Sequence, residues 1–124
     1  MPLDIEIFDD PKGKRIALGG SLDTATAPQL QRKIDESVDA SVHTVIMDLR
    51  GLEFLSSAGL RVIFKTKKLM AGRKGRFLLV NLQPQVRRVF EIIKALDGMN
   101  VFASQREMDD YLAAMQQQVL AGED

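Results

Sequence analysis

The sequence predicts an α/β domain built on a mixed, mostly parallel five-stranded sheet flanked by four helices. Segments with strand periodicity alternate with segments of helix periodicity in the order ββαβαβαβα, which is typical of a mainly parallel sheet. The first two strand segments are separated only by a short turn, which predicts an antiparallel hairpin. The apolar run TVIMDL at 44–49 indicates a strand covered on both faces.

The hairpin occupies the first 20 residues. Residues 3–8 (LDIEIF) alternate apolar and polar side chains, as a strand with one buried face does. Residues 9–14 (DDPKGK) have turn chemistry, and residues 15–20 (RIALGG) are expected to form the returning strand.

The next segment changes to helical spacing. Thr26 and Gln29 match a capping box, and Pro28 fits the first helical turn, where its missing N–H is not needed. The buried stripe of this helix is expected to contain Leu30, Ile34 and Val38.

Three more strand and helix segments complete the pattern. RGLEF, after the 44–49 strand, is interpreted as a loop, and a helix follows from Ala58 to about Met70 with Leu60, Ile63 and Phe64 facing inward. A strand at 76–82, a helix at 83–96 and a short strand within 97–104 come next. In that third helix, the inward-facing residues are expected to be Val86, Val89, Phe90 and Ile93.

A last helix is expected after Ser104, which forms a second capping box with Glu107. Its apolar stripe would contain Met108, Tyr111, Leu112, Met115 and Val119. The final AGED is expected to fray, so the sequence predicts a single domain over 1–124 with its core at about 3–116.

The composition limits the classes of function. The 124 residues carry a formal net charge of zero, so no global field attracts nucleic acid or a membrane surface. Cysteine is absent, which excludes disulfides and thiolate chemistry. The first residues do not have the pattern of a secretory signal, and no apolar run approaches the roughly 18 residues that cross a bilayer. We therefore expect a cytoplasmic protein without direct contact with nucleic acid or membrane.

Two segments follow strands and precede helices, where function collects in parallel sheets. They are GGSLDTAT at 19–26 and EFLSSAGL at 53–60, and consecutive crossovers would bring them to the same edge. An enzyme is disfavoured, because L-S-S-A-G is not the G-x-S-x-G of a hydrolase and the lone histidine, His43, precedes a strand at the opposite edge. The pairs Asp9–Asp10 and Asp109–Asp110 are interpreted as solvated surface. No metal site and no cofactor are expected.

The basic run KTKKLMAGRKGR at 65–76 has two interpretations. Cations near a helix C-terminus complement its dipole, and a turn is exposed in any case. Alternatively, the run is an electrostatic docking face for an acidic partner. Nucleic acid fits less well, because no aromatic residues are interleaved with the charges.

The serine pair at 56–57 also has two interpretations. One serine can cap the helix that follows. A helix N-terminus also has unpaired N–H groups and a positive dipole end, so it accommodates a phosphate, which would add about −1.5 to −2 charges. A cap alone does not account for two serines.

Three stretches together resemble one family. VIMDLRGLEFLSSAGLRVI at 45–63 is similar to the signature of STAS domains of the bacterial anti-sigma factor antagonist type. GGSLDTATAPQL at 19–30 and the segment 78–104 resemble the family's other recurring stretches, in the same order. The resemblance covers nearly the whole chain, and the predicted order of elements agrees with the STAS fold.

The resemblance implies a regulatory binding protein that controls transcription by partner switching. The unphosphorylated form would bind an anti-sigma factor that is also a GHKL-type serine kinase. Phosphorylation of a serine at the helix N-terminus would release it, and a PP2C-type phosphatase would reverse the step. The alternative is a STAS subunit that is never phosphorylated and acts as a binding partner in a transporter or sensory assembly.

The resemblance also implies roles for particular residues. Ser57 matches the phosphoacceptor, with Ser56 as the alternative, because many members have Asp at position 56. Asp23 matches an acidic residue that helps position the phosphorylation site. Partner-binding or packing roles fall to Thr24, Thr26, Gly59 and Leu60, of which Gly59 and Leu60 let the helix pack close to the sheet.

Overall fold

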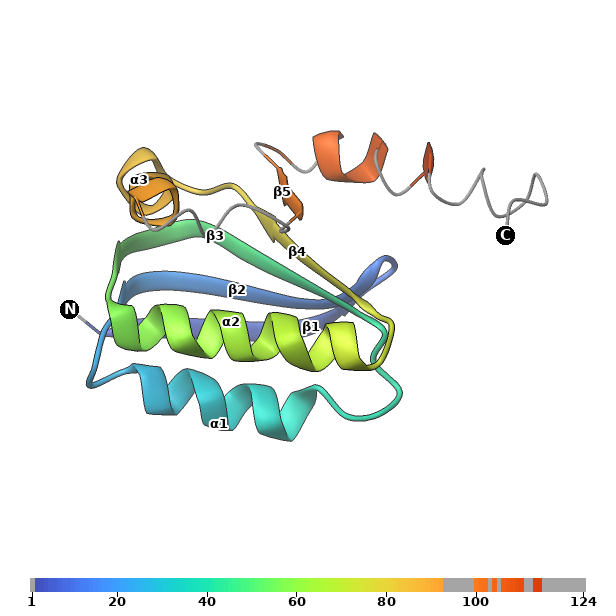
Figure 1. The fold of residues 1–124 in the computed structure, drawn as a ribbon, viewed down its shortest axis with the longest axis horizontal. Coiled ribbons are helices and arrows are strands. Elements are labelled where there is room, and N and C mark those ends of the chain that lie inside the picture. Colours follow the sequence, from blue (N-terminus) through green and yellow to red (C-terminus); the bar gives the residue numbers. More distant parts are fainter. Residues whose placement is uncertain (1, 93–99, 103, 105, 111–112, 115–124) are drawn as a thin grey trace.

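The fold is an α/β arrangement in which one sheet is covered by helices (Figure 1). The computed structural model of the chain describes residues 2–92, 100–102, 104, 106–110, 113 and 114. Its elements are β1 (Leu3–Asp10), β2 (Gly13–Leu22), α1 (Ala27–Ser37), β3 (Thr44–Leu55), α2 (Ser57–Gly72), β4 (Arg76–Val80), α3 (Pro84–Ile92) and β5 (Asn100–Phe102).

The sheet is mixed, as predicted. Its strands follow the order β1-β2-β3-β4-β5, so every strand lies beside its neighbour in sequence. β1 and β2 are antiparallel, and each later pair is parallel. The hairpin at the start of the chain therefore forms one edge of an otherwise parallel sheet, as the short 9–14 turn predicted.

β3 is longer than predicted, because RGLEF continues the strand as far as Leu55. The register between β2 and β3 shifts after Ala17 and again after Gly20, which lets the two strands stay paired to their ends. Gly51 makes this possible, since a Cβ there would lie 3.1 Å from the Gly19 Cα and 3.2 Å from the Leu18 carbonyl oxygen. The loop interpretation was wrong because these irregularities break the alternation that marks a strand.

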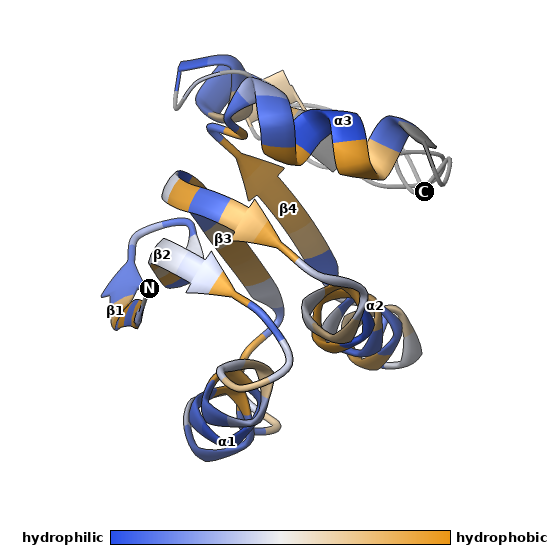
Figure 2. Ribbon diagram, turned by 90° about the vertical axis from the view of Figure 1, so that its left-hand side faces the viewer, coloured by the Kyte–Doolittle hydropathy of each residue, from blue (hydrophilic) through white to orange (hydrophobic). Residues whose placement is uncertain are grey.

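Two helices, α1 and α2, lie side by side on one face of the sheet, as both ribbon views show (Figure 2). The predicted stripes of α1 and α2 face this core, which also contains alternate residues of β2 and β3. The largest fully buried side chains in it include Ile16, Leu30, Ile34, Met47 and Ile63.

The third helix, α3, packs against β3 and turns its hydrophobic side toward it (Figure 2). Val86 and Phe90 are buried in the same core as the residues of α1 and α2. At its N-terminal end, the Gln83 side-chain amide donates to the Arg50 carbonyl at 2.6 Å. Residues 93–96 of the predicted helix, including Ile93, lie outside the described residues.

A smaller apolar cluster lies on the opposite face of the sheet. Ile46, Leu78 and Val80 are buried there with Phe102 and Met108. The predicted capping of the last helix is supported, because the Glu107 N–H donates to Ser104 Oγ at 3.2 Å. Residues 106–110 are helical. Tyr111, Leu112, Met115, Val119 and the AGED tail lie outside the described residues, so the predicted extent of the domain stays a prediction.

Candidate functional site

The site lies where the carboxyl ends of β2 and β3 meet. Leu22 pairs with Leu55 in the sheet register, and the Ser56 N–H donates to the Leu22 carbonyl at 2.9 Å. The segments 19–26 and 53–60 therefore share one edge of the sheet, as the predicted topology required. Each is followed at once by a helix, α1 or α2.

Ser56 caps α2. Its backbone is extended, with φ −92° and ψ 170°, and its Oγ accepts a hydrogen bond from the Gly59 N–H at 3.2 Å. The Ser56 carbonyl accepts from the Leu60 N–H at 2.9 Å, which is the first bond of the helix. The side chain is half-buried. The Ser56 hydroxyl thus has a structural task that fixes where the helix begins.

Ser57 is the first residue of α2 and is exposed. Within the part of the chain that the structure describes, its hydroxyl forms no hydrogen bond. The two adjacent serines therefore differ: one hydroxyl is committed to the cap and the next one faces solvent at the positive end of the helix dipole.

Gly59 sets how closely α2 approaches the sheet. A Cβ at this position would lie 2.5 Å from the Leu22 Cγ, which is closer than real contacts allow, and 3.0 Å from the Leu55 Cδ1. Leu22 and Leu55 are themselves buried, and so is Leu60 in the next position. Only glycine lets the first turn of α2 reach this depth, which in turn holds Ser57 at the edge of the sheet.

Asp23 and Thr26 hold the loop before α1 through hydrogen bonds in both directions. The Asp23 Oδ1 accepts from the N–H groups of Ala25 and Thr26, both at 2.9 Å. The Thr26 Oγ1 accepts from the Asp23 N–H at 2.8 Å and lies 2.8 Å from the Ser21 carbonyl, to which it can donate. Asp23 and Thr26 thus form a capping box three residues earlier in the sequence than the predicted one.

The predicted capping box of Thr26 with Gln29 is wrong. Thr26 makes no side-chain bond to the start of α1, because its hydroxyl is turned back toward Asp23 and Ser21. Pro28 does lie in the first turn, as predicted. Thr26 is only 7% exposed, so its hydroxyl cannot touch a partner, whereas Thr24 is exposed.

These bonds lower the pKa of the Asp23 carboxyl below its ordinary value. The Thr26 backbone N–H is the main cause, partial burial acts in the opposite direction, and the Thr26 hydroxyl and Ala25 N–H add to the lowering. Asp23 is therefore ionised at neutral pH and holds the 21–26 loop in shape beside the serines. Its bonds stabilise the loop and do not reach Ser57.

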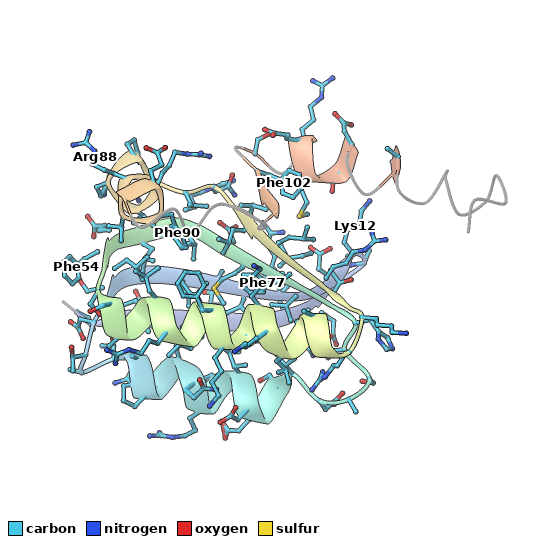
Figure 3. The ribbon with its side chains drawn as sticks, viewed as in Figure 1. Lys12, Phe54, Phe77, Arg88, Phe90 and Phe102 are labelled. Atoms are coloured by element: carbon cyan, nitrogen blue, oxygen red, sulfur yellow. The ribbon has the colours of Figure 1, made fainter. Side chains whose placement is uncertain are left out.

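Phe54 is a surface residue that the sequence did not single out. Its side chain is 52% exposed at the end of β3, two residues before the cap (Figure 3). Figure 3 shows it at the outer edge of the domain, whereas Phe77 and Phe90 lie within it. The available signal was the aromatic residue between Leu52 and Leu55, both of which are buried. A single exposed ring is common on protein surfaces, but this one lies three residues before the exposed Ser57.

The arrangement does not support hydrolysis by a serine. His43 lies just before β3, and Ser57 just after it. A strand of 12 residues separates the two ends by roughly 36 Å. Within the described ranges, no group of three or more His, Cys, Asp or Glu side chains could hold a metal ion. No described helix is long and apolar enough to cross a membrane.

Comparisons with known proteins agree with this geometry. The STAS domain family profile matches residues 5–108. BtrV of Bordetella bronchiseptica, to which the role of anti-sigma factor antagonist is ascribed, is 40% identical over 86 residues, 68% of this chain and 74% of BtrV.

Two solved structures have the same fold. An anti-sigma factor antagonist from Mycobacterium paratuberculosis has a TM-score of 0.78 at 25% identity, covering 92% of this chain and 94% of that one. SpoIIAA of Bacillus in its phosphorylated form has a TM-score of 0.70 at 24% identity, covering 88% and 99%. With the profile match over most of its length, the chain belongs to the STAS domain family.

Proposed function

We propose that this chain is an anti-sigma factor antagonist that is switched by phosphorylation of Ser57. In the unphosphorylated state it binds an anti-sigma factor with GHKL-type serine kinase activity, and phosphorylation releases it. A PP2C-type phosphatase restores the binding form. The observation that carries the proposal is the exposed Ser57 hydroxyl at the first residue of α2, next to a Ser56 hydroxyl that is already engaged as the cap.

The difference between the serines supports Ser57 as the acceptor. A kinase must reach the hydroxyl with its active site, and only Ser57 is exposed. Phosphorylation of Ser56 would convert the Oγ that accepts from the Gly59 N–H into an ester oxygen, a weaker acceptor, and would insert a dianion into a half-buried position. Ser at position 56 departs from the commonest pattern of the family, in which many members have Asp, and the cap gives that serine a role that needs no phosphate.

The start of α2 can accept the added charge. The first-turn N–H groups and the helix dipole favour an anion at this position. Arg61 is exposed and lies four residues after Ser57, so the two side chains occupy one face of the helix. We therefore expect the phosphate to leave the fold intact and to act on the contact surface alone.

The surroundings of Ser57 supply a contact surface for the partner. Phe54 offers an exposed ring, and Thr24 is exposed on the neighbouring loop. Asp23 shapes that loop through its bonds to Thr26, which supports an indirect role in positioning rather than contact with the phosphate. The relatives named as antagonists of anti-sigma factors support the identity of the partner class.

Intact-mass measurement with a GHKL-type kinase and ATP tests the acceptor. Wild-type protein should gain one phosphate, and Ser57→Ala should gain none. Ser56→Ala should still gain one, although loss of the cap should lower its free energy of unfolding by about 0.5–2 kcal/mol. Ser57→Ala should change that free energy by less than about 0.5 kcal/mol. Complete phosphorylation of Ser57→Ala would contradict the assignment.

Calorimetry tests release by charge. Ser57→Asp should bind the kinase at least about tenfold more weakly than wild type, which corresponds to about 1.4 kcal/mol. Ser57→Asn, which has a similar size and no charge, is the control and should lose much less. A chain that no candidate kinase phosphorylates would instead fit the alternative, a STAS subunit that serves as a binding partner in a transporter or sensory assembly.

A further inference from the structure

The charges of this chain are distributed unevenly along the sequence. The whole chain has 17 basic and 17 acidic residues, yet residues 54–90 contain no aspartate or glutamate. The positive charges of this segment are concentrated on α2 and the turn that follows it. A chain with no net charge therefore has one strongly basic helix, which the proposed switching of Ser57 does not explain.

The structure divides the basic run at 65–76 into two parts. Arg73, the C-cap residue of α2, donates to the carbonyls of Asp39 at 2.5 Å and Val42 at 3.3 Å, so it ties the helix end to the preceding loop. Lys65 and Lys68 are exposed in the middle of the helix. Within the described residues, neither forms an ion pair.

The helix dipole does not explain the lysines on α2. The last turn of α2 contains no basic residue, and its first turn contains no acidic one, so the expected complement to the dipole is missing at both ends. Arg61, Lys65 and Lys68 follow one another at spacings of four and three, where like charges repel. The interpretation of this run as a dipole complement is therefore wrong for the mid-helix residues. Asp35 of α1 lines a groove beside Lys65 and Lys68, but among the described residues no ion pair with an acidic side chain offsets the repulsion.

The same face of α2 is hollowed. A groove of about 530 Å³ is lined by Arg61, Phe64, Lys65, Lys67, Lys68 and Ala71. Phe64 is half-buried and packs against the main core, so its ring forms an apolar floor between the cations. On the other side of Lys65 and Lys68, a second groove toward α1 includes Leu69, which is 40% exposed.

We propose that this basic face of α2 binds an acidic amphipathic helix of a partner protein. The partner would insert apolar side chains over Phe64 and Leu69 and direct carboxylates to Arg61, Lys65 and Lys68. These three cations lie within the eight residues 61–68, about 10 Å along the axis, which two turns of a partner helix match. A helix fits better than nucleic acid, because the groove has a single aromatic residue, Phe64, among its cations, whereas strands of nucleic acid stack on several aromatic rings along a basic groove.

A designed peptide serves as the probe, and the unphosphorylated chain is used, so the outcome does not depend on Ser57. The designed peptide is 18 residues long and forms a helix with leucines on one face, flanked by glutamates. The control is a scrambled peptide of the same composition, which has the same net charge but no amphipathic helical face. Fluorescence anisotropy gives the affinities, and amide chemical shifts of the ¹⁵N-labelled chain locate the binding site.

The designed peptide should shift the amides of α2 between residues 61 and 71, and the scrambled peptide should bind at least fivefold more weakly. Lys65→Glu/Lys68→Glu should lower the affinity at least tenfold, and Lys65→Gln/Lys68→Gln should lower it less. The matched control is Arg32→Glu/Lys33→Glu, which makes the same charge change at exposed positions of α1 and should alter the affinity less than twofold. Leu69→Ala should weaken binding without altering its salt dependence.

Three results would overturn the proposal. The first is an equal loss in the α1 control, which would mean non-specific attraction between charges. The second is the absence of shifts in α2 at millimolar peptide. The third is equal or tighter binding of single-stranded DNA at the same amides, which would assign the face to nucleic acid. The glutamine variant keeps the test valid if charge reversal should unfold the helix, and circular dichroism checks that each variant is folded.

Discussion

The starts of α1 and α2 are built in different ways, although both lie at the carboxyl ends of neighbouring strands. Before α1, Asp23 and Thr26 satisfy one another, and the Thr26 hydroxyl is buried. At α2, Ser56 makes one capping bond and Ser57 presents a hydroxyl to solvent. At the start of α1 both side chains are engaged in hydrogen bonds within the loop. At the start of α2 the Ser57 hydroxyl takes no part in the hydrogen bonds that hold the helix end. The difference shows that one residue, Ser56, can hold the backbone while its neighbour stays available for the proposed modification.

The largest effect is expected at Gly59, whose replacement would push the first turn of α2 away from the sheet. Gly59→Ala should lower the free energy of unfolding by about 1–3 kcal/mol, because its Cβ would overlap the buried Leu22 side chain. Gly72→Ala in the same helix is the matched control. A Cβ there meets nothing within 4 Å, so alanine should stabilise the protein by up to about 1 kcal/mol. Urea denaturation measures both, and equal effects would contradict the close approach of α2.

The next effect is expected at Thr26, where a substitution removes the hydrogen bonds that hold the loop before α1. Thr26→Val keeps the shape but removes the bonds to the Asp23 N–H and the Ser21 carbonyl. Because the position is buried, the unpaired groups should cost about 1–3 kcal/mol of unfolding free energy. Thr24→Val, at an exposed position of the same loop, should cost less than about 0.5 kcal/mol. A Thr26→Val variant as stable as wild type would mean that this hydroxyl does not stabilise the loop before α1.

The smallest effect is a pH dependence at Asp23. Its folded-state pKa is lowered, so its contribution to stability is fully present above the unfolded value of about 3.9 and is lost as the pH falls through the folded value. The difference in unfolding free energy between wild type and Asp23→Asn should therefore shrink between pH 5 and pH 2. Carboxyl titration by NMR measures the pKa directly. A value at or above that of the unfolded chain would remove the basis of this prediction.

The sequence predicted those parts of the fold that depend on local pattern. Alternation marked β1, and helical spacing marked the stripes of α1 and α2, because burial on one face repeats with a fixed period. The meeting of the 19–26 and 53–60 segments followed from topology alone, since parallel strands end at the same edge. Ser57 was likewise selected by its position after a strand and by family resemblance.

The predictions that were wrong or missing concern features that depend on contacts between residues distant in sequence, or on a choice between two capping partners at the same spacing. The extension of β3 rests on pairing with β2 through two register shifts and on the contact of Gly51 with Gly19. Thr26 has a possible capping partner three residues away in each direction, and spacing cannot choose between Asp23 and Gln29. The exposure of Phe54 also depends on how β3 ends against β2 and α3.

The capping of α2 by Ser56 has a consequence for engineering. Because residue 56 holds the helix start and residue 57 does not, the proposed switch would place changes that alter stability and changes that alter recognition at different positions. Two copies of this domain could therefore be given separate signalling channels in one cell by redesigning exposed neighbours such as Phe54 and Thr24 while Ser56 and Gly59 are kept. The scaffold would be shared, and the crosstalk between the two channels would be set by surface residues alone.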